Sequence, residues 1–211
     1  MEKSVLQATS GSGASAIVLS EHDLWSRDFE SVSKLLEKSH TVRQIKLMPV
    51  SSQNWRDVSD QLIDIVEQNK IRASYVVAFG ESASIALHVA LLKGKLIRRL
   101  VLVNPRFRPD PNKLTQLIDK IESILPLGLP FRVKGDQFDA RPFLQRIRFP
   151  VLVIDTKSVS REEKESELIN QSLPTSWYLK TESLESQEVK DALLEFEDVP
   201  AKRPQKKRKK A

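Results

Sequence analysis

Cysteine is absent from the 211 residues of this sequence, and histidine occurs only three times, as His22, His40 and His88. Without cysteine the chain cannot form a disulfide framework or a thiolate metal site. The three histidines lie too far apart along the chain to give the ligand spacing of a zinc site. We therefore predict no bound metal, and the absence of cysteine fits a reducing compartment.

Glycine is also scarce, with six residues in the chain. Neither of the glycine-rich phosphate loops, G-x-x-x-x-G-K and G-x-G-x-x-G, is present. Each of these loops needs its glycines so that backbone N–H groups can approach a phosphate. The sequence therefore predicts no nucleotide-binding site, and we expect the protein to work without a cofactor.

Long apolar runs are missing as well. No stretch reaches the roughly 18 apolar residues that a membrane-spanning helix needs. The first residues, Met1-Glu2-Lys3-Ser4, lack the apolar core of a signal peptide. We therefore expect a soluble, cytoplasmic protein with no membrane span.

Negative charge is missing from the C-terminal end of the sequence. Seven cations follow Ala201 with no acid among them, and without these seven the chain has 27 Lys and Arg against 28 Asp and Glu. The net charge of +6 therefore belongs to this basic tail, which we expect to be disordered because like charges repel. The cations are Lys202, Arg203, Lys206, Lys207, Arg208, Lys209 and Lys210.

Three functions remain open for the basic tail. It can bind nucleic acid or another polyanion without sequence specificity, because each Lys or Arg can contact a phosphate. It can act as a nuclear localisation signal if the organism is eukaryotic, and the protein would then be nuclear. It can also serve only to keep the protein soluble.

Short apolar runs alternate with amphipathic stretches along the rest of the chain. This alternation predicts an α/β fold with a mostly parallel six-stranded sheet flanked by helices. The expected strands are 16–19, 41–48, 75–79, 100–103, 151–154 and 176–179. We expect residues 1–14 to form a flexible N-terminal segment, 15–198 the folded domain and 199–211 the disordered tail.

The chain is organised around residues 75–105, which predict a strand, a tight turn, a helix and a second strand. The turn reads Gly80-Glu81-Ser82-Ala83-Ser84. Its small residues on both sides of Ser82 suit a sharp turn in which strand and helix pass close together. In a parallel βαβ unit such a turn lies at the carboxyl end of the sheet.

This turn resembles the nucleophile elbow of the α/β-hydrolase family, G-x-S-x-G, with Ser84 in place of the last glycine. A second stretch, FLQRIRFPVLVI at 143–154, is similar to the approach to the strand that carries the family's acid. The resemblance covers roughly 16–197. It implies that Ser82 is the nucleophile, in a left-handed backbone conformation, and that the backbone of Ala83 helps to bind the oxyanion.

For the fold, the same resemblance implies the spatial strand order 2-1-3-4-5-6 in the numbering of the expected strands. It also implies that the family's early antiparallel strands are lost or vestigial. Residues 114–138 would form a much reduced lid.

Three departures from the family's pattern concern its catalytic groups. The family's acid would fall at Ser158, and its histidine would fall within the sequence Lys180-Thr181-Glu182-Ser183-Leu184. Its oxyanion loop, usually H-G, would fall at Ser20-Glu21-His22-Asp23, which has no glycine. We therefore predict that the catalytic triad is lost and that the protein is a non-catalytic binding or scaffold module for a small molecule or another protein.

Two alternatives remain. The protein can be a serine hydrolase of ester or acyl substrates, with Ser82 as nucleophile, His22 as base and Asp155, at the end of a strand, as the acid that orients it. It can also be a polyanion-binding or nucleic-acid-binding adaptor in which the basic tail makes the contacts.

Overall fold

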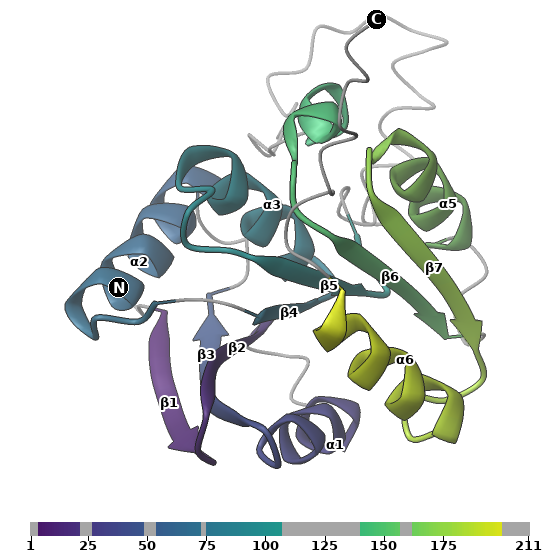
Figure 1. The fold of residues 1–211 in the computed structure, drawn as a ribbon. Coiled ribbons are helices and arrows are strands. Elements are labelled where there is room, and N and C mark those ends of the chain that lie inside the picture. The colour runs from purple at the N-terminus through teal and green to yellow at the C-terminus, as the bar shows by residue number, and fades with distance from the viewer. Residues whose placement is uncertain are drawn as a thin grey trace, which may run out of the picture.

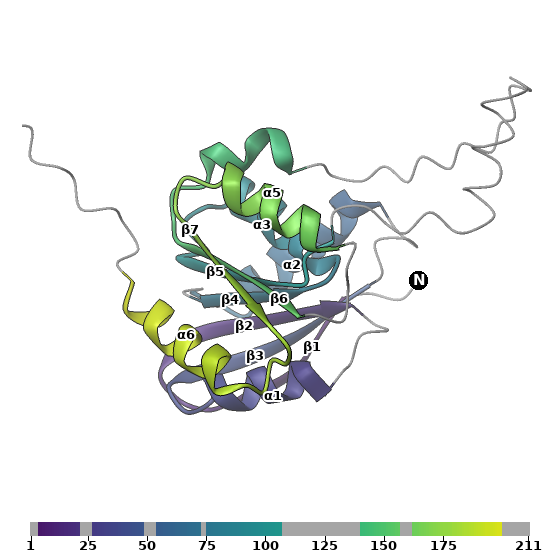
Figure 2. The same cartoon turned by 90° about the vertical axis from the view of Figure 1, so that its right-hand side faces the viewer.

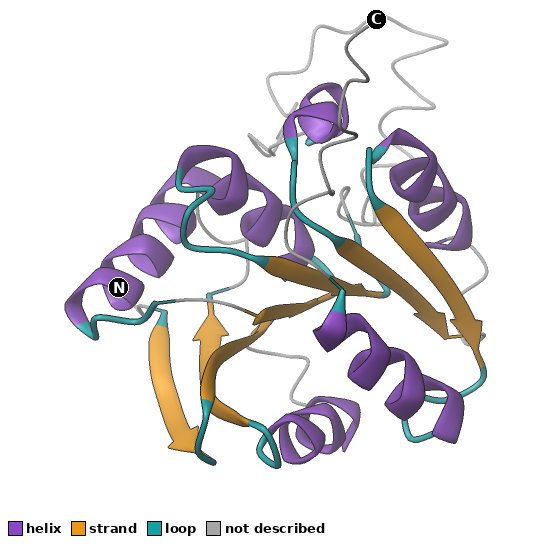
Figure 3. Ribbon diagram, viewed as in Figure 1, coloured by secondary structure: helices purple, strands orange, loops and turns teal. Residues whose placement is uncertain are grey.

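The computed structural model describes residues 4–21, 27–48, 54–72, 75–106, 140–156 and 162–199. The expected base His22, the position Ser158, the predicted lid at 114–138 and the basic tail lie outside the described residues. Within the described part, strands and helices alternate along the chain (Figure 3). This confirms the predicted α/β fold class.

The described strands form one seven-stranded sheet, in the order β1-β3-β2-β4-β5-β6-β7. The strands are β1 (Val5–Ser10), β2 (Ala14–Glu21), β3 (His40–Leu47), β4 (Tyr75–Phe79), β5 (Arg99–Val103), β6 (Val151–Thr156) and β7 (Ser176–Thr181). The helices are α1 (Arg27–Leu36), α2 (Trp55–Gln68), α3 (Ser82–Leu92), the 3-10 helix η2 (Arg141–Arg146), α5 (Glu162–Ser172) and α6 (Gln187–Asp198).

The order of the six strands β2 to β7 is the one predicted from the sequence. All neighbours among these six pair in parallel. Their carboxyl ends therefore meet at one edge of the sheet, and their amino ends meet at the other (Figure 1). In an open parallel sheet, the carboxyl edge is where ligands usually bind.

Strand β1 corrects the expectation of a flexible segment over 1–14, because residues 5–10 form an antiparallel strand at the edge of the sheet. It pairs antiparallel with β3 from Val5 opposite Lys46 to Ser10 opposite Val42. Its side chains are mostly exposed, so backbone hydrogen bonds hold it and the apolar pattern is weak. Gly13, directly before β2, has a φ of 122°, and a side chain there would collide with the carbonyl oxygen of Ser39.

Helices cover both faces of the sheet (Figure 2). Helices α2, α3 and α5 pack on one face, and α1 and α6 pack on the other. Alternate residues of β2 enter the two cores, with Ile17 and Leu19 on the first side and Ala16 and Val18 on the second. Strands buried on both faces read as continuous apolar runs, which is why the sequence predicted them well.

Helix α3 is apolar on nearly all sides, and it is buried between the sheet and α2. A helix of this kind is stabilised by burial from every direction. Its first residue, Ser82, is therefore held rigidly at the carboxyl edge of the sheet, where β4 ends at Phe79.

Candidate functional site

The turn between β4 and α3 is built around Gly80. Its backbone has a left-handed φ of 55°. Its N–H donates to the carbonyl of Val103 at 3.0 Å, and its own carbonyl accepts from the N–H groups of Ala83 at 3.3 Å and Arg106 at 3.0 Å. These bonds tie the turn to β5 and to the segment after it, so the left-handed conformation is fixed by its surroundings.

The expected left-handed backbone at Ser82 is therefore wrong. Among the described residues other than glycine, only Lys70 and Asn104 have a positive φ. The chain reverses direction at Gly80, and Glu81 already has helical angles, with φ −70° and ψ −24°. Ser82 continues that helical course as the first residue of α3.

The side chain of Ser82 is completely buried. Its Oγ atom lies 2.6 Å from the carbonyl oxygen of Phe79 and 3.1 Å from that of Leu19. A hydroxyl group has one proton to donate, and here backbone carbonyl groups at the ends of β4 and β2 take it. Ser82 therefore joins two strands to α3, and its hydroxyl is not presented to a substrate.

A second buried polar group, Glu21, lies at the same edge and was missed from the sequence. It ends β2, its side chain is almost fully buried, and its Oε1 atom has no hydrogen-bond partner. Burial, and to a lesser degree the charge of Glu81, raises the pKa of Glu21 to about 8. The backbone N–H groups of Glu81 and Ser82 and the charge of Arg106 lower this pKa, but by less.

Glu21 is consequently a neutral carboxylic acid through most of the range below pH 8. The only hint in the sequence was its position at the end of an apolar strand, in the loop that corresponds to an oxyanion loop. Acidic residues are almost never fully buried unless they are paired, so a sequence pattern gives little reason to expect one there.

Asp155, the expected acid, is buried at the carboxyl end of β6. Its two carboxylate oxygens accept hydrogen bonds from the Ser166 hydroxyl at 2.6 Å and the Tyr178 hydroxyl at 2.9 Å. These contacts join β6 to α5 and β7. The structure therefore supports a structural role for Asp155, and its pairing with His22 lies outside the described residues.

The two described histidines lie away from the Ser82 hydroxyl. His88 is in the middle of α3, and its Nδ1 atom is 2.9 Å from the Ser59 hydroxyl oxygen. Since that hydroxyl donates to the Trp55 carbonyl, the His88 Nδ1–H must donate to Ser59. Burial lowers the pKa of His88, which favours the neutral ring at neutral pH.

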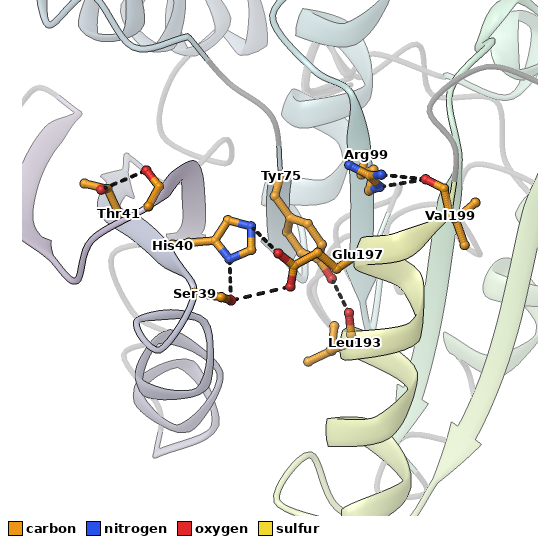
Figure 4. Close-up of polar contacts among 9 residues, drawn as sticks. Ser39, His40, Thr41, Tyr75, Arg99, Leu193, Glu197 and Val199 are labelled. Atoms are coloured by element: carbon orange, nitrogen blue, oxygen red, sulfur yellow. Dashed lines mark hydrogen bonds and ion pairs between the residues drawn. The ribbon is translucent and has the colours of Figure 1, made fainter.

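His40 belongs to a network at the amino edge of the sheet, which the sequence did not predict (Figure 4). It begins β3 and is buried. Its ring nitrogens lie 2.9 Å from Ser39 Oγ and 3.5 Å from Glu197 Oε1. In the same network, the Arg99 guanidinium donates twice to the carbonyl of Val199. Because Ser82 lies at the opposite edge, His40 cannot act as its base.

Comparisons with known proteins identify the fold. No protein-family model matches the sequence, and no curated protein matches it at the sequence level. Solved structures do match the fold. An esterase from Thermogutta terrifontis superposes with a TM-score of 0.67 at 14% identity, over 92% of each chain. The chain has the α/β-hydrolase fold.

Two further neighbours agree with this assignment. An α/β hydrolase from Sphaerobacter thermophilus has a TM-score of 0.64 at 18% identity, and the match covers 92% of this chain and 95% of the other. The enol-lactonase from Burkholderia xenovorans has a TM-score of 0.66 at 14% identity, and the match covers 90% of this chain and 94% of the other. Identities this low show the fold alone.

The α/β-hydrolase fold shows which residue occupies the central position of the elbow. The elbow pattern places one residue in a strained turn, with a small residue two positions to each side. Here Gly80 has that conformation, and Ala78 and Ser82 are the small residues around it. The backbone elbow is thus centred two residues before the predicted position, on a residue without a side chain.

The expected oxyanion donor also changes with this shift. The N–H of Ala83 donates to the Gly80 carbonyl, so it is already used within the turn. In an elbow centred on Gly80, the donor after the central residue is the N–H of Glu81. That N–H is one of the two that influence the Glu21 carboxyl group. Glu21 therefore lies where an α/β hydrolase would bind the substrate's oxyanion.

Two features are absent from the described residues. No cluster of three or more His, Cys, Asp or Glu side chains there could hold a metal ion. No helix in that part of the chain is both long and apolar enough to cross a membrane.

The strained backbone of Gly80 gives a first prediction. Gly80→Val should lower the free energy of unfolding by about 2 kcal/mol or more, because a β-branched residue cannot readily adopt a left-handed φ. Glu81→Val is the matched control. Since Glu81 has ordinary helical angles, this variant should lose much less free energy of unfolding. Urea unfolding of both variants would measure the difference, and equal losses would contradict the shifted elbow.

Proposed function

We propose that this chain is a non-catalytic member of the α/β-hydrolase fold that serves as a binding or scaffold module. The observation that carries the proposal is the elbow itself. Its central position is Gly80, and the neighbouring Ser82 hydroxyl is buried and bonded to backbone carbonyls. A nucleophilic serine needs an accessible hydroxyl and a base within hydrogen-bond reach.

The buried Glu21 carboxyl group supports the same proposal. An oxyanion site must be open to the substrate, with N–H donors aimed at the developing negative charge. At this edge an acidic side chain already lies beside those donors. Glu21 therefore already takes up N–H groups that a substrate oxyanion would need.

The alternative is a serine hydrolase of ester or acyl substrates that uses Ser82, with His22 as base and Asp155 as acid. The names of the structural neighbours support it, because they include an esterase and an enol-lactonase. Catalysis would require Ser82 to exchange its bonds to Phe79 and Leu19 for a bond to a base. For this reason the geometry of the described site supports it less well.

Active-site labelling separates the two proposals. We expect no labelling of the full chain by a fluorophosphonate probe and no turnover of short acyl esters, because the Ser82 hydroxyl is buried and bonded to backbone carbonyls. Mass spectrometry of the probe-treated protein would identify a labelled residue. Rapid labelling that is abolished by Ser82→Ala but retained in Ser84→Ala would establish the hydrolase alternative.

A polyanion-binding adaptor remains a further candidate for the whole protein, in a cytoplasmic or nuclear location. Its support is the charge distribution, since the seven cations of the basic tail account for the net positive charge. The partner could be nucleic acid or another polyanion, and its test is given in the Discussion.

A further inference from the structure

A pocket of about 440 Å³ opens at the end of α3 that is farthest from the elbow. One wall is the C-terminal half of α3, from His88 to Leu92, and continues to Gly94. The other wall is formed by 143 and 146–149, from η2 and the approach to β6. The pocket therefore lies toward the amino edge of the sheet, and it is separate from the site around Gly80 and Glu21.

The pocket has apolar walls and a cationic rim. Its apolar surface includes Leu91, Phe143 and Phe149, and its charged residues are Arg146 and Arg148. Among the described residues that line it, none is acidic. The guanidinium carbon of Arg146 lies over the Phe143 ring, 5.2 Å from its centroid, so a cation–π contact holds it beside the apolar wall.

The His88 side of the pocket adds no positive charge at neutral pH. The ring is held by Ser59 at Nδ1 and lies edge-on against Trp55, with 4.5 Å between ring centroids. Its lowered pKa favours the neutral form. The attraction for an anion thus comes from the two arginines, while the rest of the lining favours an apolar group.

We propose that this pocket binds a small organic anion with a flat apolar body, such as an aromatic carboxylate. The volume lies within the range of small-molecule sites, roughly 300–1,000 Å³. Arginine can bind a carboxylate through two parallel N–H donors. The apolar body would lie against Leu91 and Phe143. The proposal does not depend on whether Ser82 reacts, because the two sites lie at opposite ends of α3.

The test uses 2-naphthoate as the probe and naphthalene-2-methanol as its neutral analogue. Titration of the full chain, followed by amide NMR shifts, should show saturable 2-naphthoate binding with the largest shifts at Ala90, Gly94 and Phe143. Arg146→Gln should weaken naphthoate binding about tenfold, since a charge-assisted contact is lost. The neutral analogue should bind wild type and Arg146→Gln within about twofold of each other, because it has no carboxylate for the arginine.

Two further variants complete the design. Arg72→Gln is the matched control, because Arg72 is exposed and does not line the pocket, and naphthoate binding should be unchanged in it. Leu92→Glu adds a carboxylate at an exposed position of the rim and should abolish naphthoate binding. The proposal is overturned if no saturable shifts occur, if they centre elsewhere, or if Arg72→Gln weakens binding as much as Arg146→Gln.

Discussion

Between about pH 4.5 and pH 8, the free energy of unfolding is expected to fall by about 4 kcal/mol because of Glu21 alone. The pKa of this carboxyl group is raised from 4.5 to about 8 in the folded protein. Well below pH 4.5, Glu21 is protonated in both the folded and the unfolded protein, so its ionisation takes nothing from the free energy of unfolding. As the pH rises, the unfolded chain releases the proton first, so unfolding is favoured until the folded pKa is passed.

Glu21→Gln isolates this effect from all other titrating groups. The amide keeps the size of the protonated carboxyl group but cannot ionise, so the variant should lose less stability between pH 4.5 and 8 than wild type does. Urea unfolding at four pH values would give both curves. Glu81→Gln should reduce the loss partly, because the charge of Glu81 helps to raise the pKa of Glu21. Parallel curves for wild type and Glu21→Gln would contradict the buried neutral acid.

The basic tail should bind duplex DNA with an affinity that falls about a thousandfold between 50 and 200 mM salt. Five to seven phosphate contacts by the cations between Lys202 and Lys210 imply a log–log slope near −5 to −6. No base specificity is expected, because specificity requires a rigid element placed in a groove. Mobility-shift titrations at the two salt concentrations would measure the slope.

Removal of all residues after Pro200 should abolish this binding. A second variant that replaces the seven tail cations with glutamine keeps the chain length and should behave in the same way. Thermal unfolding of both should stay close to that of wild type if the tail packs against nothing. If the shortened protein binds DNA as tightly as the full chain does, the tail is not the contact. Arg106, Arg108 and Arg132, which lie beside or within the expected lid at 114–138 in the sequence, would then be the next candidates.

The sequence predicted the central sheet well, because its signals are strong and local. Apolar runs of four or five residues, such as 100–103 and 75–79, are buried on both faces, and the helices between them have the expected lengths. Strand β1 escaped prediction for the opposite reason. It buries little side-chain surface and is held by backbone hydrogen bonds to β3, which no side-chain pattern reveals.

The elbow was found, but its centre was misplaced by two residues. Small residues recur at Ala78, Gly80, Ser82 and Ser84, so the pattern fits two registers equally well, and the serine made the later one attractive. Only the backbone angles distinguish them, since Gly80 is left-handed and Ser82 is not. Glu21 could not be predicted at all, because its pKa depends on burial and on neighbours 60 positions away in the chain.

The contact between Arg99 and Val199 also limits how far the tail can reach. It fixes the end of α6 to the start of β5 at the amino edge of the sheet. Lys210 follows Val199 by 11 positions, which corresponds to at most about 40 Å of fully extended chain. The phosphate groups that these cations contact must therefore lie within about that distance of Val199, plus the length of one side chain.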